Sequence, residues 1–269
     1  MKFFGTDGIR GPFGGEIINH DFAVSFGRAL GKFLRLEGKV GGSVILGRDS
    51  RPSGKGLQDA CGNGLRMEGF QPLDAGMIPS PALAYGVIQS KALLGIMVTA
   101  SHNPHSDNGL KVFSPYGSKL SIEEEQIIET CIEPTLQTAH SDFQAKFIEV
   151  EGPYLENLLT RFPPNTLRGM KVVLDLANGA TQSTTPLAFE ALGAEGVLLN
   201  AGDGMINLDA GSEFPRQAAQ RVITEKADLG IAHDGDGDRV VFIDPAGQVV
   251  DGDKVLGLIA AIAMENGIL

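Results

Sequence analysis

The sequence predicts an α/β protein built from two consecutive three-layer domains with mixed, mostly parallel sheets. Short runs of β-branched or aliphatic residues alternate with helical patterns along the chain, the order typical of βαβ units. The length of 269 residues corresponds to about two domains. Hydrophobic residues make up 42% of the chain, which supplies two apolar cores and excludes a disordered chain.

The alternation begins with a predicted strand over residues 44–46, an aliphatic run that ends at a Gly-Arg-Asp turn. Leu57, Ala60, Cys61 and Leu65 then recur at i, i+3, i+4 and i+8, which places them on one face of a helix. The predicted elements that follow are a strand near 70–73, a helix over 81–89 and strands over 93–98 and 110–113.

Two local signals mark the end of the first domain. Residues 107–109 (Asp-Asn-Gly) have the chemistry of a hairpin turn leading into the strand at 110–113. Ser121 and Glu124 have the spacing of a capping box, which predicts that a helix begins there. Residues 135–143 show no clear periodicity, and we place a domain junction near residue 150.

The α/β alternation restarts after this junction. The predicted elements are helices over 154–162 and 185–192 and strands over 172–176, 197–199, 229–232, 240–243 and 249–250. A last helix begins at Asp253 and has an apolar face with no strand after it. If that face is exposed, it would favour self-association.

The charge balance excludes several classes of partner. With 22 Lys and Arg against 33 Asp and Glu, the net charge is −11, whereas nucleic acids and anionic membranes require a basic face. The longest apolar stretch, residues 256–264, is far shorter than the roughly 18 residues of a membrane span, and the first residues contain no secretory apolar run. Cys61 and Cys131 are predicted to be small buried hydrophobic residues. We therefore expect a cytoplasmic protein.

The strongest local motif is the acidic loop between the strands at 229–232 and 240–243. Asp234, Asp236 and Asp238 alternate with glycines, so their carboxylates can converge on one side of the backbone. Three adjacent carboxylates repel one another unless a cation lies among them, and oxygen ligands select Mg²⁺ or Ca²⁺. An EF-hand is excluded because Arg239 and Pro245 stand where that loop needs glycine and glutamate. Three acidic ligands leave coordination positions open, which favours catalytic Mg²⁺.

A second motif, Thr-Ala-Ser-His-Asn-Pro at residues 99–104, follows an apolar strand, where α/β proteins place ligand sites. It contains Ser101 with His102 beside it. No serine lies in the G-x-S-x-G pattern of a serine-hydrolase elbow. A serine that accepts phosphate beside a magnesium site is therefore more coherent than one that accepts an acyl group, although a serine bonded to its own turn remains an alternative.

Basic residues near these motifs could bind phosphate. Arg10 lies in a glycine-rich segment and could clamp phosphate through two hydrogen bonds. Lys111 lies ten residues after Ser101, beyond a turn that could fold it back beside the serine. Asp49 and Gly56 break the P-loop pattern, and no G-x-G-x-x-G joins a strand to a helix, so neither a P-loop nor a dinucleotide site is predicted.

Residues 4–11, 99–111 and 234–239 together resemble the motif set of the α-D-phosphohexomutases. The resemblance extends over all 269 residues, with secondary matches at 47–51, 175–180, 206–207 and 251–253, and the opening octapeptide favours the branch that acts on glucosamine phosphates. Phosphomannomutase or phosphoglucomutase activity, a haloacid-dehalogenase-like phosphatase using residues 236–240, and a non-catalytic metal- or phosphate-binding module are the alternatives.

The resemblance implies a mechanism. Ser101 would carry a phosphoryl group and exchange it with a hexosamine phosphate through a 1,6-bisphosphate. Mg²⁺ would be held by the three aspartates and a phosphoserine oxygen. Arg10 and Arg239 would clamp phosphate, and Lys111 or His102 would be the general acid or base.

The resemblance also implies a domain division. Residues 1–150 would form the phosphoserine domain, residues 151–252 the magnesium domain, and residues 253–269 the first helix of a third domain. Family members have four domains, and the sugar-gripping and phosphate-anchoring motifs of the last two are not found in these residues. The sequence is therefore expected to be an amino-terminal portion that partners with the missing carboxy-terminal domains and shows little or no turnover alone.

Overall fold

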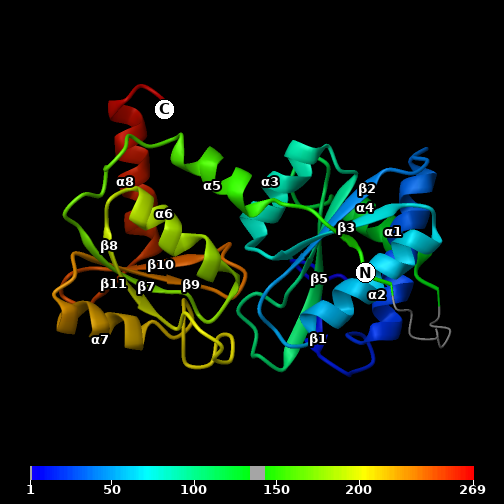
Figure 1. Cartoon of the computed structure of the whole chain (residues 1–269), viewed down its shortest axis with the longest axis horizontal. Coiled ribbons are helices and arrows are strands. Elements are labelled where there is room, and N and C mark those ends of the chain that lie inside the picture. The colour runs from blue at the N-terminus through cyan, green and yellow to red at the C-terminus, as the bar shows by residue number, and fades with distance from the viewer. Residues whose placement is uncertain (1, 134–142) are drawn as a thin grey trace.

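The computed structural model describes residues 2–133 and 143–269 and shows two α/β lobes side by side (Figure 1). Each lobe is a sheet with helices on both faces, so the predicted pair of α/β domains with mixed sheets is confirmed. Among the described residues, five of the nine strand pairs are parallel.

The first lobe contains six strands and four helices within its described residues. In chain order they are β1 (Ile9–Pro12), α1 (His20–Leu36), β2 (Ser43–Arg48), α2 (Gly54–Met67), β3 (Gln71–Met77), α3 (Ser80–Ser90), β4 (Leu94–Val98), β5 (Asp107–Phe113), α4 (Ile122–Cys131) and β6 (Lys146–Phe147). The sheet order is β1-β5-β4-β2-β3-β6. Strands β4, β2, β3 and β6 are parallel to one another. Strand β5 is antiparallel to both of its neighbours, β1 and β4, so the chain reverses direction in the loop after β4.

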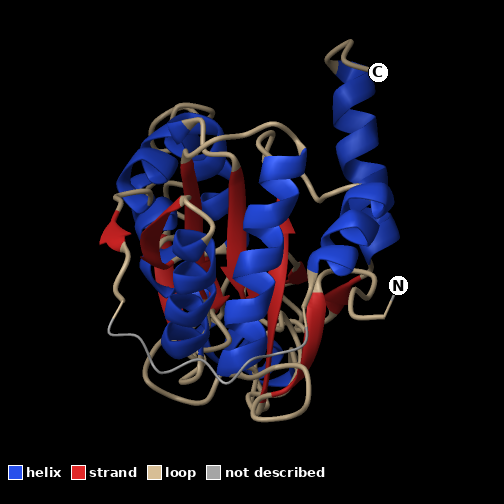
Figure 2. Ribbon diagram, turned by 90° about the vertical axis from the view of Figure 1, so that its right-hand side faces the viewer, coloured by secondary structure: helices blue, strands red, loops and turns tan. Residues whose placement is uncertain are grey.

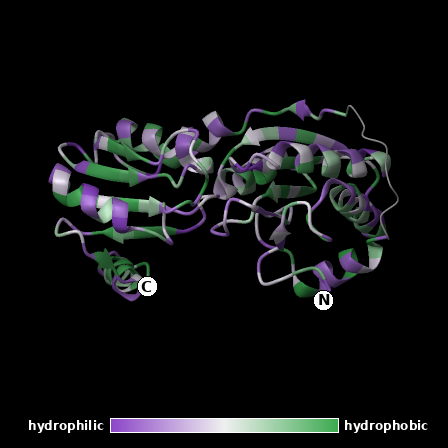
Figure 3. Ribbon diagram, turned by 90° about the horizontal axis from the view of Figure 1, so that it is seen from below, coloured by the Kyte–Doolittle hydropathy of each residue, from purple (hydrophilic) through white to green (hydrophobic). Residues whose placement is uncertain are grey.

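The core of the first lobe has two parts, one on each face of the sheet. On one face, α1, α2 and α4 pack against aliphatic side chains of β2, β4 and β5, with Phe26 completely buried. On the other face, α3 packs against β2 and β4. Helices α1 and α2 approach closely because Gly27 of α1 faces the backbone of α2 and Gly64 of α2 faces the backbone of α1. A Cβ on Gly64 would lie 2.2 Å from the Val24 carbonyl oxygen. Figure 3 shows hydrophobic residues (green) along the strands and helices of both lobes.

Helix α5 (Glu151–Leu159) leads from the first lobe into the second and contacts α3. The elements that follow are β7 (Lys171–Asp175), a 3₁₀ turn (Ala180–Ser183), α6 (Thr185–Ala191), β8 (Glu195–Leu199), α7 (Arg216–Glu225), β9 (Leu229–His233), β10 (Val240–Ile243), β11 (Val249–Val250) and α8 (Gly252–Glu265). The sheet order is β11-β10-β9-β7-β8. Helix α7 packs on one face through Ala218 and Val222, and α6 packs on the other through Phe189.

Helix α8 confirms the helix predicted from Asp253. Asp251 caps its first turn, and none of its residues is buried. Figure 2 shows the helix projecting away from the rest of the molecule, and its exposed side chains include Leu256, Ile259 and Ile262. In the part of the chain that the structure describes, no helix combines the length and apolarity needed to cross a membrane.

One predicted local structure is wrong. Residues 107–109 are not a hairpin turn but the first residues of β5, where Asn108 pairs with Gly11 of β1. Gly109 allows this close packing, since a Cβ there would lie 2.5 Å from the carbonyl oxygens of both Ile9 and Thr99. Asn108 is fully buried and donates its amide hydrogen to Ser53 Oγ, so tertiary partners replace the local turn. The capping box of Ser121 and Glu124 is confirmed at the start of α4. Most of the 135–143 segment lies outside the described residues.

Candidate active site

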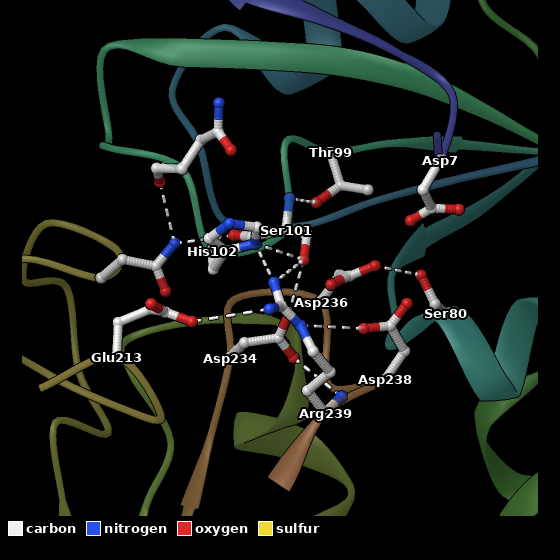
Figure 4. Close-up of polar contacts among 12 residues, drawn as sticks. Asp7, Ser80, Thr99, Ser101, His102, Glu213, Asp234, Asp236, Asp238 and Arg239 are labelled. Atoms are coloured by element: carbon white, nitrogen blue, oxygen red, sulfur yellow. Dashed lines mark hydrogen bonds and ion pairs between the residues drawn. The ribbon is translucent and has the colours of Figure 1, made fainter. Parts of the chain in front are cut away.

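The candidate site lies where two loops meet between the lobes (Figure 4). The serine loop, residues 99–106, follows the carboxyl end of β4, and the metal loop, residues 234–239, follows the carboxyl end of β9. Open α/β sheets bind ligands at the carboxyl ends of their strands. The two lobes thus present their strand ends to a common site.

Ser101 occupies the centre of this site and is 1% exposed. Its backbone is left-handed, with φ +50°, and its N–H donates to Thr99 Oγ1 over 2.8 Å. The Ser101 hydroxyl donates to Asp234 Oδ2 over 2.6 Å, and Arg239 Nη2 donates to the hydroxyl oxygen over 2.9 Å. The structure therefore brings the predicted serine, aspartate and arginine together across the lobe boundary.

The three aspartates of the metal loop converge. One carboxylate oxygen from each of Asp234, Asp236 and Asp238 lies within 4.8 Å of the others. Burial, followed by the charges of Asp234 and Asp238, raises the pKa of Asp236 to about 7. Burial also raises the pKa of Asp234, although the Ser101 hydroxyl opposes this shift. The loop thus concentrates negative charge, and burial disfavours the charged forms of Asp234 and Asp236.

The metal loop fits a hard divalent cation. Ser80 donates to Asp236 Oδ2 over 2.5 Å, whereas Asp236 Oδ1 is buried and has no hydrogen-bond partner among the described residues. A buried carboxylate oxygen without a donor is costly unless a cation binds it. All ligand atoms available at this point are oxygens, which Mg²⁺ prefers. Asp234, Asp236, Asp238 and the oxygen on Ser101 are the groups that could hold the ion.

The predicted basic residues lie around the aspartates. Lys111 Nζ lies 2.6 Å from Asp238 Oδ2 and 3.1 Å from Asp7 Oδ2, and Arg10 Nη2 lies 2.6 Å from the same Asp7 oxygen. Burial lowers the pKa of Lys111, but the hydrogen bond and charge of Asp238 outweigh it, so the net shift is upward. Burial and the nearby positive charge of Arg10 lower the pKa of Arg239. Two guanidinium groups therefore lie close together, an arrangement suited to an anion.

His102 also lies at the site. Its Nδ1 is 3.4 Å from Ser101 Oγ and contacts Arg239 Nη2. A guanidinium can only donate, so Nδ1 is the acceptor in this contact. His102 is thus held as a neighbour of the serine by the arginine of the other lobe.

Several site residues were not singled out from the sequence. Asp7 bridges Arg10 and Lys111, and Ser80 bonds Asp236. Arg51 and Asn207 donate to carbonyl oxygens of the serine loop. The motif matches at 47–51 and 206–207 contain the last two residues, but only the folded chain shows what they contact.

Comparison with known proteins agrees with this geometry. Residues 1–138 match the profile of phosphoglucomutase/phosphomannomutase α/β/α domain I, and residues 152–247 match that of domain II. The chain belongs to the phosphoglucomutase/phosphomannomutase family.

Curated relatives in the family include the phosphoglucosamine mutases of Psychromonas ingrahamii, 42% identical over 274 residues, and Aeromonas hydrophila, 41% identical over 272 residues. These alignments cover 100% and 99% of this chain and 61% of each relative. The chain thus spans about 61% of the length of these curated relatives.

Solved structures show the same fold. A phosphoglucomutase/phosphomannomutase family protein from Burkholderia thailandensis is 28% identical with a TM-score of 0.80, covering 96% of this chain and 58% of that one. N-acetylphosphoglucosamine mutase from Aspergillus fumigatus, solved with GlcNAc-6P and magnesium, is 18% identical with a TM-score of 0.54. That alignment covers 99% of this chain and 56% of the fungal protein, and at this identity it supports the fold alone.

Proposed function

We propose that the chain carries the phosphoserine and magnesium parts of a phosphoglucosamine mutase, which interconverts glucosamine 6-phosphate and glucosamine 1-phosphate. The observation that carries this proposal is the 2.6 Å hydrogen bond from the Ser101 hydroxyl to Asp234 within a cluster of three aspartates. Glucosamine as the sugar is supported by the relatives at 41–42% identity, which are phosphoglucosamine mutases. Phosphomannomutase or phosphoglucomutase activity is the alternative within the same family.

In the proposed reaction, the phosphoryl group on Ser101 Oγ passes to a free hydroxyl of the sugar phosphate. The sugar oxygen forms a bond to phosphorus, the bond to Ser101 Oγ breaks, and a 1,6-bisphosphate results. The other phosphoryl group of that intermediate then returns to Ser101 Oγ. Bound Mg²⁺ supplies charge neutralisation for the transferring group.

The neighbouring residues bind and orient the reacting groups. Arg10 and Arg239 hold phosphate oxygens, because a guanidinium matches phosphate with two parallel hydrogen bonds. Lys111 exchanges the proton of the sugar hydroxyl with the help of its pairing to Asp238, and His102 is the alternative group for this role. The first transfer requires this group to accept the proton of the attacking sugar hydroxyl, and the return transfer requires it to donate a proton to the sugar oxygen that leaves phosphorus. The upward shift of the Lys111 pKa favours the protonated form, which suits the return transfer.

The site geometry disfavours the phosphatase alternative. That mechanism would use Asp236 as the nucleophile, but Asp236 Oδ2 accepts the hydroxyl hydrogen of Ser80 and the carboxylate belongs to the aspartate cluster that fits a cation. Ser101 Oγ contacts the aspartate cluster directly and can carry phosphate beside it.

Phosphopeptide mass spectrometry after incubation with a sugar 1,6-bisphosphate and Mg²⁺ tests this proposal. We expect an acid-stable phosphate on Ser101 that is lost in the Ser101→Ala variant. Ser106→Ala is the matched control, because Ser106 is an exposed serine of the same loop and should leave the mark unchanged. A hydroxylamine-labile phosphate on an aspartate, with Ser101 unmodified, would instead support the phosphatase mechanism.

A further inference from the structure

We propose that Asn207 is a positioning residue: from the second lobe, its side-chain amide fixes the backbone of the serine loop so that Ser101 Oγ faces the aspartate cluster. The inference rests on the proposed function and deepens it. Asn207 contacts backbone carbonyls of the serine loop. We therefore expect it to act through Ser101.

The contacts of Asn207 join the two lobes. Asn207 Nδ2 donates to the carbonyl oxygen of Ser101 over 2.7 Å and to that of Asn103 over 3.0 Å. Arg51 Nη2, from the first lobe, donates to the same two oxygens over 3.0 and 2.9 Å. Each carbonyl is therefore held by one donor from each lobe, and Asn207 is 7% exposed.

The serine loop needs such restraint because Ser101 has an unfavourable backbone conformation. Its φ of +50° is left-handed, a region that residues other than glycine rarely adopt. Thr99 fixes the Ser101 N–H on one side of the residue, and Asn207 with Arg51 fixes the carbonyl on the other. With both peptide groups held, the Cα–Cβ bond has one direction, which is toward Asp234.

Asn207 is itself held rigidly by the second lobe. Its φ is +59°, which asparagine tolerates better than most residues, and its N–H donates to the Ala177 carbonyl over 3.0 Å. The Ala177 N–H in turn donates to the buried Asp175 carboxylate. Asn207 is thus anchored at the carboxyl end of β7, which lies beside β9, the strand that precedes the metal loop.

The metal loop leaves space for this contact at Gly235. A Cβ on Gly235 would lie 2.8 Å from the Ser101 carbonyl oxygen and 3.1 Å from Asn207 Nδ2. The serine loop, Asn207 and the metal loop therefore meet at one point. This juxtaposition links the direction of Ser101 to the position of the aspartates.

The test measures how far phosphate on Ser101 strengthens metal binding. The 269-residue chain is prepared with serine or genetically encoded phosphoserine at residue 101, and Mn²⁺ affinity is measured by electron paramagnetic resonance. With Asn207 intact, we expect phosphoserine to raise the Mn²⁺ affinity about tenfold or more. In Asn207→Gly and Asn207→Asp this gain should fall below about threefold, because the residue that orients a metal ligand is lost. Glycine tolerates the positive φ, whereas aspartate keeps the size but loses the donor.

Asn266→Ala is the matched control. It removes another amide-to-carbonyl hydrogen bond, on the exposed end of α8, and should leave the gain unchanged. A gain retained in both Asn207 variants would overturn the positioning role. An equal loss of Mn²⁺ affinity in the unphosphorylated variants would overturn it as well, because that result indicates a general structural role. If phosphoserine gives no gain even with Asn207 intact, the proposed function fails first and the inference fails with it.

Discussion

The two lobes share one architecture but differ in how their helices and charges are stabilised. In the first lobe, α1 buries 11 of its 17 residues against α2, α4 and the sheet. In the second, α7 buries two residues and α8 buries none. The helices of the first lobe thus bury more residues than those of the second.

The same contrast holds at the site. The backbone polar groups of Ser101 have partners in Thr99, Arg51 and Asn207. The second lobe instead holds four of the five buried side-chain atoms that have no hydrogen-bond partner among the described residues, and two of these, Asp236 Oδ1 and His233 Nδ1, lie in or directly before the metal loop. The serine is thus held from both lobes, whereas the metal loop of the second lobe leaves a buried carboxylate oxygen that a cation would satisfy.

The largest predicted effect tests whether the stability of the second lobe depends on a bound cation. In the metal-free chain, Asp236 has a pKa of about 7, against an ordinary value of 3.8, so the folded state binds its proton more tightly than the unfolded state. The free energy of unfolding should therefore fall as pH rises from about 4 to 7, by up to about 4 kcal/mol, and Mg²⁺ should reverse the fall. Hydrogen exchange of β9 at pH 5 and 7.5, with EDTA or Mg²⁺, measures this.

Asp236→Asn provides the control for the pH effect. Its carboxamide cannot ionise, so the metal-free decrease in stability should shrink. An unchanged pH dependence in this variant would contradict the assignment to Asp236.

A second prediction compares glycines in helices of the two lobes. Gly64→Ala would place a Cβ 2.2 Å from the Val24 carbonyl oxygen, so it should separate α1 from α2 and destabilise the first lobe by about 3 kcal/mol. The Cβ added by Gly257→Ala on α8 would lie more than 4 Å from any atom outside its own stretch of helix. Because alanine favours a helix more than glycine does, this change should stabilise α8 by about 0.5–1 kcal/mol. Urea unfolding measures the first change, and far-ultraviolet circular dichroism with hydrogen exchange of α8 measures the second. Similar effects at both positions would contradict the proposed difference in packing.

The smallest effect concerns helix caps. Ser121→Ala removes the capping box of α4, which packs on α1, and should lower the unfolding free energy of the first lobe by about 1 kcal/mol. Asp251→Ala removes the cap of α8, but this helix buries no residue, so only its own amides should exchange faster. A shift in the global urea midpoint on Asp251→Ala would show that α8 is coupled to the second lobe.

Local sequence patterns predict most of the fold. The alternation of strands and helices gives the two α/β domains, and the residues of the α4 capping box are adjacent in sequence. The predictions omit α1 and α7. The periodic Phe22, Phe26 and Leu30 could have identified α1 despite the helix-weakening Gly27. Helix α7 has too few apolar residues for a clear periodicity, since its burial depends on two small side chains.

For the site, the sequence by itself predicted which residues would carry the chemistry, because alternating aspartates and a serine at a strand end are recognisable without a fold. The tertiary structure alone brought Ser101 to Asp234, 133 positions away, and showed that residues 107–109 begin a strand. It also revealed Arg51 and Asn207, whose partners in the serine loop are backbone carbonyls. Every residue has a carbonyl, so no side-chain pattern can indicate which one a distant donor binds; only the packing of two lobes selects it.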